Sequence, residues 1–133
     1  MMQNLSKKRT GFTLVELLVV IAIIGLLSTI VLVSFGPVRN QARDTAIKAN
    51  MSQMRLAAEI QYINNTNYQS AQSRSDYLAA KAAAESASGG TVTESFSPSA
   101  YCIKSTLPGG GNWCLDSTGK SGDYATCATQ ACS

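Results

Sequence analysis

The sequence predicts an α+β protein with a long N-terminal helix and a small antiparallel β head that carries disulfides. Residues 12–35 form an almost unbroken apolar run, and residues 38–63 continue with the periodicity of an amphipathic helix. After residue 90, short strand candidates alternate with Gly-rich turns, and all four cysteines lie in this part. The order of these features predicts a membrane-spanning helix that continues as an amphipathic helix and ends in the head.

The apolar run from Phe12 to Phe35 is 24 residues long. A helix needs about 20 apolar residues to cross the hydrocarbon core of a bilayer. A cleaved secretory signal has a shorter apolar region followed by a small-residue cleavage site, and no such site follows Phe35. The run therefore predicts an anchor that is retained in the mature protein.

Glu16 is an exception within this apolar run. A carboxylate at the centre of a membrane helix costs about 2.5–3.5 kcal/mol, and less near its end. One explanation is local, because Thr13 and Glu16 have the spacing of a capping box at the start of a helix. The other is that Glu16 needs a cationic partner inside the apolar phase, such as a free α-amino group.

Residues 7–17, with the sequence KKRTGFTLVEL, resemble the class III signal of type IV prepilins and pseudopilins. In that family a membrane prepilin peptidase cuts between the Gly and the Phe and then methylates the new N-terminus. By position, the resemblance implies cleavage after Gly11, N-methylation of Phe12 and an assembly carboxylate at Glu16. It covers about the first half of the chain, whereas the second half is similar only in general style.

The expected organisation therefore has four parts. The leader contains three of the eleven basic residues, so its removal leaves eight basic and eight acidic residues and a net charge of zero. A neutral chain has no basic field for nucleic acid, and no specific nucleic acid is expected as a partner. The parts are a basic leader that is removed (1–11), a transmembrane and assembly helix (12–36), an amphipathic helix (37–63) and a globular head (64–133).

Two features of the helical region allow alternatives. Gly36 and Pro37 predict a helix break, either a kink or unwound stretch near residues 33–37 or the first turn of a second helix. An apolar stripe then recurs at helical spacing, and we expect the head to pack on it rather than a separate partner. The stripe consists of Val38, Ala42, Ala46, Ala49, Leu56, Ile60 and Ile63.

The head is expected to begin with a turn after residue 63 and to contain one short helix and three strands. The helix is predicted over residues 77–87, capped by Ser75 and Asp76 and ended by Gly89 and Gly90. The strand candidates are residues 91–96, 101–106 and 112–118.

The last two strand candidates predict a hairpin that also suggests how the cysteines pair. Antiparallel pairing about residue 108 places Cys102 opposite Cys114 and Ile103 opposite Trp113 on the other face. This register predicts a Cys102–Cys114 disulfide, which leaves Cys127 to pair with Cys132, although four cysteines permit three connectivities. The chain has no His and no CxxC pair, so no zinc site is expected.

The segment from Asp116 to Asp123 is a Gly-punctuated loop with two carboxylates. Some pseudopilins bind calcium in a comparable loop. Here Lys120 lies inside the loop and no bidentate Glu follows at the EF-hand distance. We therefore expect a solvated turn and no metal.

The sequence gives no indication of an enzyme or of a cofactor. It has no His, P-loop, dinucleotide-binding glycine pattern or clustered pair of acids. The resemblance implies instead a structural subunit of a type IV pilus filament, anchored by one pass in the inner membrane before assembly and located on the cell surface afterwards. The implied partners are identical subunits, the prepilin peptidase and a pilus or secretion assembly platform. The alternatives are a pseudopilin of a type II secretion system, a competence pilin, and a monomeric membrane-tethered adhesin module.

Overall fold

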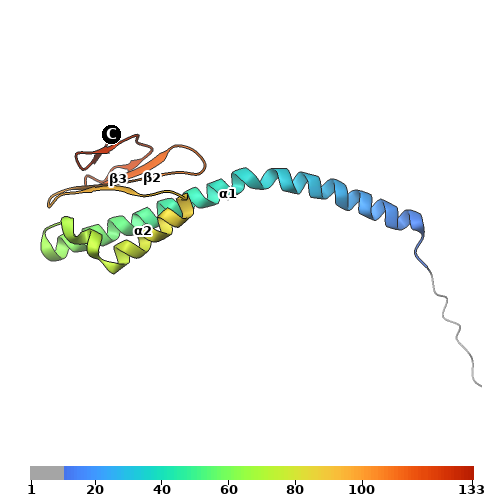
Figure 1. The fold of residues 1–133 in the computed structure, drawn as a ribbon, viewed down its shortest axis with the longest axis horizontal. Coiled ribbons are helices and arrows are strands. Elements are labelled where there is room, and N and C mark those ends of the chain that lie inside the picture. Colours follow the sequence, from blue (N-terminus) through green and yellow to red (C-terminus); the bar gives the residue numbers. More distant parts are fainter. Residues whose placement is uncertain (1–10) are drawn as a thin grey trace, which may run out of the picture. The chain divides into compact units, whose positions relative to one another are not determined.

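The computed structural model describes residues 11–133, with the side chains of residues 32–34 excepted. The basic residues of the expected leader lie outside the described residues. The described chain separates into two compact units, the first ending at Phe35 and the second comprising Gly36–Ser133. One helix, α1 (Leu14–Asn65), contributes to both units (Figure 1).

In the first unit α1 is apolar on all sides. Its segment Leu14–Val31 has a mean hydropathy of 2.8 over 18 residues, and none of it is buried. By length and composition this is the single helix of the described chain that can cross a membrane. The predicted membrane-spanning helix is thus present as a helix, beginning two residues after Phe12.

Two of the three predicted forms of the helix break at Gly36 and Pro37, an unwound stretch and the start of a second helix, are wrong. The helix assignment continues through both residues, and Pro37 lies inside α1. Proline removes one backbone donor and disturbs one preceding turn. The turns on either side keep their hydrogen bonds, so the helix continues and no second helix begins at Pro37.

The second unit contains a four-stranded antiparallel sheet in the order β1-β2-β3-β4. Its strands are β1 (Thr93–Phe96), β2 (Tyr101–Thr106), β3 (Asn112–Asp116) and β4 (Ser121–Gly122). A separate C-terminal hairpin pairs β5 (Cys127–Ala128) with β6 (Ala131–Cys132). The three strands expected from the sequence are confirmed, whereas the three shortest were not predicted.

The register of the β2–β3 hairpin differs from the predicted one by two residues. Ile103 faces Leu115, and Lys104 faces Cys114. The loop between the strands uses five residues, in which the Leu107 N–H donates to the Gly111 carbonyl (3.1 Å). A shift by two residues preserves the face on which each side chain lies. The predicted division into an apolar face and a cysteine face is therefore correct, although the predicted cross-strand partners are wrong.

The apolar face of the sheet covers the second half of α1 together with α2 (Ser75–Ser88). Figure 1 shows both helices on one side of β2 and β3 and the C-terminal strands on the other side. The helix α2 follows a short 3-10 helix, η1 (Gln69–Ser73), and ends at Gly89, whose φ of 72° is left-handed. The predicted glycine end of α2 is confirmed. At its start Arg74 holds the N-cap position without a capping hydrogen bond, whereas Asp76 Oδ1 accepts the Tyr77 N–H of the first turn at 2.9 Å.

The head packs on a different face of α1 from the one predicted. Ile47, Met51 and Met54 are fully buried beneath the sheet, whereas Leu56 is 60% exposed and Ile63 is 76% exposed. Both faces of α1 carry large and small apolar side chains, and contacts of Asp44, Lys48 and Arg55 with the head hold the sheet over the face with Ile47. The prediction that the head packs on the stripe is therefore wrong.

The predicted disulfide pairing is also wrong. The bonds join Cys102 to Cys127, with 5.7 Å between their Cα atoms, and Cys114 to Cys132, with 6.0 Å. In the observed register Cys102 faces Asp116 rather than Cys114, so the two cysteines of the sheet are diagonal neighbours. The C-terminal hairpin lies over this face and brings a direct partner to each of them, which attaches the end of the chain to the sheet twice.

Candidate functional site

The residues around the expected cleavage site form a capping box. The Thr13 backbone N–H and hydroxyl donate to Glu16 Oε2 at 2.9 and 2.7 Å. In return the Glu16 N–H donates to Thr13 Oγ1 at 3.3 Å. The local explanation for Glu16 is therefore confirmed at the level of hydrogen bonding, and the carboxylate retains acceptor capacity for a further partner.

Gly11 and Phe12 precede this box in a segment without regular secondary structure. Phe12 is 84% exposed, and a Cβ built on Gly11 would meet no atom within 4 Å. Packing within the described chain therefore does not require glycine at this position. The assignments of Gly11 to cleavage, Phe12 to methylation and Glu16 to assembly remain predictions.

The first unit exposes an apolar surface that its own chain does not cover. Leu14 is 79% exposed and Leu26 66% exposed, and the other large side chains between them are similarly open. Soluble monomers rarely expose continuous apolar patches larger than a few hundred Å². This segment requires lipid or other protein around it.

The apolar stripe of α1 in the second unit is a second uncovered surface. We call it the α1 stripe, with the seven residues defined above. Val38 is 58% exposed, and the four-residue and seven-residue steps along the stripe place its members on the face opposite Ile47 and Met54. In this part α1 therefore has two apolar faces, one that packs against the head and one whose residues are exposed, except for the partly buried Ile60.

Polar contacts fix the head on α1 and thereby leave the α1 stripe open. Asp44 accepts the Gly109 N–H at 3.0 Å, and Gly109 approaches so closely that a Cβ would overlap the carboxylate. Lys48 Nζ lies 4.5 Å from the centre of the Trp113 ring, a cation–π contact. Arg55 donates to the carbonyls at both ends of the β3–β4 turn, at 3.2 and 2.6 Å.

Glu59 completes this set of contacts from α1 to the sheet. It accepts hydrogen bonds from the Tyr101 hydroxyl at 2.8 Å and from the Tyr68 hydroxyl at 3.0 Å. Burial, and then the neighbouring Glu59 carboxylate, raise the pKa of Tyr68 to about 12. The same two causes raise the pKa of Tyr101. Both hydroxyls thus remain protonated donors over the physiological range.

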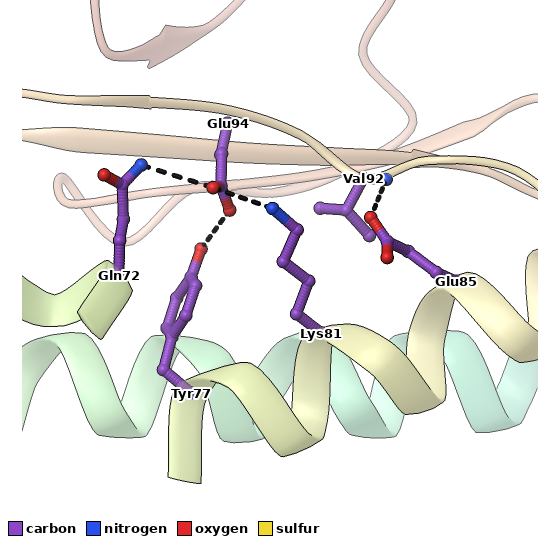
Figure 2. Close-up of polar contacts among 6 residues, drawn as sticks. All are labelled: Gln72, Tyr77, Lys81, Glu85, Val92 and Glu94. Atoms are coloured by element: carbon purple, nitrogen blue, oxygen red, sulfur yellow. Dashed lines mark hydrogen bonds and ion pairs between the residues drawn. The ribbon is translucent and has the colours of Figure 1, made fainter. Parts of the chain in front are cut away.

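A second carboxylate, Glu94 on β1, connects α2 and η1 to the sheet. Figure 2 shows Gln72, Tyr77 and Lys81 directed toward it. Glu94 accepts from the Tyr77 hydroxyl at 2.7 Å, from Lys81 Nζ at 2.9 Å and from the Gln72 amide at 3.3 Å. Burial and this carboxylate raise the pKa of Tyr77. The cluster holds α2 in place and is structural in character.

The loop from Asp116 to Asp123 is a turn that is exposed over residues 118–121, as the sequence predicts, but Asp116 at its start is buried. Asp116 is 1% exposed and accepts the N–H groups of Thr118 (2.9 Å), Lys120 (3.1 Å) and Cys132 (3.0 Å). Burial by itself raises the pKa of Asp116, but these hydrogen bonds outweigh it and hold the pKa below its usual value.

The two carboxylates of this loop serve different backbone groups. Asp123 accepts the Asn112 N–H at 3.0 Å, whereas Asp116 is saturated by its own loop and by the C-terminal strand. The carbonyls at the ends of the β3–β4 turn are occupied by Arg55. Because these oxygens already have partners within the chain, the loop does not fit the oxygen cage that calcium requires.

Sequence reasoning missed the buried face of α1 and the two carboxylates that fix the head. Ile47, Met51 and Met54 do follow the i, i+4, i+7 spacing of a buried face, which was the available signal. For Glu59 and Glu94 no such signal exists, because their tyrosine partners are distant in the sequence.

Comparison with known proteins agrees with these features. The prokaryotic N-terminal methylation motif matches residues 6–32. The chain is 33% identical to the type IV wide pilus major component PilA4 of Thermus thermophilus over 116 residues, which are 87% of this chain and 86% of that protein. No solved structure shows a significant match. With the methylation motif at its N-terminus and this identity over most of its length, the chain belongs to the type IV pilin family.

Proposed function

We propose that the chain is a structural subunit of a type IV pilus filament, anchored in the inner membrane before assembly and packed against identical subunits through α1 afterwards. The observation that carries the proposal is the α1 stripe. An apolar helix surface outside the membrane-spanning segment has no use in an isolated, membrane-tethered head. In a filament, neighbouring copies of α1 would cover it.

We further propose that a prepilin peptidase cuts after Gly11 and methylates Phe12. The matched methylation motif and the exposure of Gly11 and Phe12 ahead of α1 support this assignment. Mass spectrometry of the protein purified from cells tests it, and the expected product begins at methylated Phe12. An intact N-terminus, or one beyond Phe35, rejects the proposal. Replacing Gly11 should leave the precursor uncut on an immunoblot.

Glu16 is proposed to set the axial register of the filament by pairing with the Phe12 amine of a neighbouring subunit. A buried polar group that fixes register is the best-attested role of such residues. Glu16→Ala should leave cleavage largely intact and reduce filament yield in electron micrographs.

The capping box provides a matched control for that experiment. Thr13→Val removes two of the three capping hydrogen bonds but retains the carboxylate. If Glu16 sets the axial register of the filament, Thr13→Val subunits assemble better than Glu16→Ala subunits. Equal loss in both variants means that Glu16 serves only as a helix cap.

The rival proposals within the family are a pseudopilin of a type II secretion system and a competence pilin. The relative from Thermus thermophilus is named as the major component of a pilus. Similarity to it favours an abundant pilus subunit, with motility and adhesion as the accompanying roles. Purifying surface filaments and sequencing their main protein tests this choice. Filaments found only when a secretion system is overproduced would indicate a pseudopilin.

The proposed partners are identical subunits, the prepilin peptidase and the assembly platform. Membership of a family of structural subunits indicates a non-enzymatic role. The alternative of a monomeric adhesin module accounts for the head but leaves the α1 stripe uncovered.

A further inference from the structure

Arg39 and Arg43 differ from the other charged residues of α1 in the second unit. Each of the others has a partner in the head, namely Gly109 for Asp44, Trp113 for Lys48, two turn carbonyls for Arg55 and two tyrosines for Glu59. Arg39 and Arg43 are exposed, and among the described residues neither has a hydrogen bond or an ion pair. Their charges are available to a partner outside the chain.

The two arginines lie on one face of α1, because they are four residues apart. Like charges at this spacing destabilise a helix by about 0.2–0.5 kcal/mol, a penalty that a bound anion would reverse. Arg43 in turn lies four residues before Ile47, which is fully buried beneath the sheet. The pair thus continues the face that carries the head, at the end of that face that is nearer the apolar segment in sequence.

Carboxylates of a second copy would have to share their oxygens between this pair and the contacts that they already make. The chain has eight acidic residues, and each of them already accepts at least one hydrogen bond within its own chain. The eight are Glu16, Asp44, Glu59, Asp76, Glu85, Glu94, Asp116 and Asp123. A neighbouring subunit therefore offers no carboxylate that is free of such contacts.

Phosphate groups of phospholipids fit the position better. Arg39 follows Val31, the last residue of the apolar segment, by eight residues. A helix that enters a hydrocarbon core of about 30 Å at Leu14 leaves it after about 20 residues, near residue 33. Arg39 and Arg43 then follow the core by about 6 and about 10 residues in sequence, a short separation. Long arginine side chains reach back over such a distance to the headgroups.

We propose that Arg39 and Arg43 bind the phosphates of anionic phospholipids at the outer surface of the membrane while the subunit awaits assembly. The guanidinium fork matches two phosphate oxygens, and its charge cannot be lost by deprotonation. The contact sets the depth of the subunit in the bilayer and ends when the subunit is extracted. This inference rests on the membrane-anchored state of the proposed function and does not depend on filament formation.

The test uses the purified full-length subunit in nanodiscs of phosphatidylethanolamine and phosphatidylglycerol. Native mass spectrometry measures which lipid the released protein retains. The wild type should retain phosphatidylglycerol in preference, and Arg39→Gln with Arg43→Gln should reduce that preference about fivefold per arginine, which corresponds to about 1 kcal/mol each near a membrane surface. Arg74→Gln is the matched control, because Arg74 lies in the head and pairs with Asp76.

Unchanged preference in the double variant would overturn the inference. A double variant that keeps the wild-type lipid preference but forms fewer filaments in cells would overturn it too, and would identify a second copy as the partner. A subunit that enters the nanodisc and prefers neither lipid rejects this inference alone, whereas one that does not enter the nanodisc rejects the anchored state as well.

Discussion

Asp116 holds the β3–β4 turn and the last strand of the chain at the same time. Its Oδ1 atom accepts donors from Thr118 and Lys120, and its Oδ2 atom accepts the Cys132 N–H. A buried carboxylate is stable only when such donors compensate its desolvation. Here one ionised side chain organises a loop that would otherwise have no partner for its backbone N–H groups.

Asp116→Asn should lower the free energy of unfolding of the head by about 1–3 kcal/mol, because its NH2 group cannot accept and leaves either the Cys132 N–H or the loop N–H groups without an acceptor. The folded pKa of Asp116 is depressed, so its stabilisation is complete above the unfolded pKa of about 3.9. It is lost as the pH falls through the lower, folded pKa. Thermal unfolding of the full chain in detergent between pH 7 and pH 2 measures both effects.

Asp123→Asn is the control for this experiment. Asp123 is exposed and accepts one hydrogen bond, from the Asn112 N–H. The free energy of unfolding of the control should lie within about 1 kcal/mol of the wild-type value and should depend on pH as in the wild type. If the Asp116 variant keeps the same acid sensitivity as the control, the role assigned to the buried carboxylate is incorrect.

At the scale of elements, α1 in the second unit is apolar on two opposite faces. The face with Ile47 and Met54 is buried by the sheet, and the α1 stripe is open. A helix that is apolar all round is normally buried on all sides. The stripe should therefore contribute to assembly and not to the stability of the single subunit.

Leu56→Gln with Ile63→Gln tests this separation. The double variant should change the midpoint of thermal unfolding little, because surface substitutions usually change the free energy of unfolding by no more than about 0.5 kcal/mol. It should reduce the number of filaments in electron micrographs. Met54→Ala, on the buried face, should instead destabilise the head by about 2–5 kcal/mol. Wild-type filament yield from the Leu56 and Ile63 variant would show that the stripe is not an assembly surface.

The attachment of α2 to the sheet depends on Glu94, which receives three donors from α2 and η1 (Figure 2). Glu94→Gln turns an NH2 group toward at least one of these donors. We therefore expect the free energy that holds α2 on the sheet to fall by about 1–3 kcal/mol. Hydrogen exchange should show faster exchange along α2 and unchanged protection in β2 and β3.

Asp76→Asn provides the matched comparison, because it removes the exposed ion pair of Asp76 with Arg74 at 2.7 Å. Exposed pairs contribute at most about 1 kcal/mol, so α2 should exchange almost as slowly as in the wild type. Equal effects of the two substitutions on exchange along α2 would mean that the hydrogen bonds of Glu94 stabilise α2 no more than an exposed ion pair does.

At the scale of the whole head, two disulfides attach the C-terminal hairpin to the cysteine face of the sheet. Cys102, Cys114 and Cys132 are all buried there, and the sulfur atoms of Cys102 and Cys114 lie only 3.4 Å apart without being bonded. Each native disulfide of this kind contributes about 2–4 kcal/mol. The end of the chain is therefore part of the folded head and not a free tail.

Tryptic digestion without reduction distinguishes the two pairings. Cleavage after Lys104 and Lys120 separates Cys102, Cys114 and the two C-terminal cysteines into three peptides. Bonds from Cys102 to Cys127 and from Cys114 to Cys132 should hold all three together in one mass. If residues 121–133 appear alone with an internal disulfide, the pairing predicted from the sequence is correct and the structure is wrong in this respect.

The sequence by itself determined the features that depend on local pattern. The length of the apolar run, the capping box of Thr13 and Glu16, the β2–β3 hairpin and the glycine end of α2 all follow from neighbouring residues. Alternation along a strand also assigned the cysteines to one face and Ile103 to the other, because a register shift of two residues leaves the faces unchanged.

Only the tertiary structure decided which surfaces meet. Both faces of α1 are apolar, and which of them is buried depends on the contacts that α1 makes with residues of the sheet that are distant in the sequence. The disulfide pairing depends on the five-residue loop that shifts the hairpin register and on a C-terminal hairpin too short to leave a pattern in the sequence. Local patterns determine which elements form, whereas packing between distant segments determines what each element buries and what it leaves open for a partner.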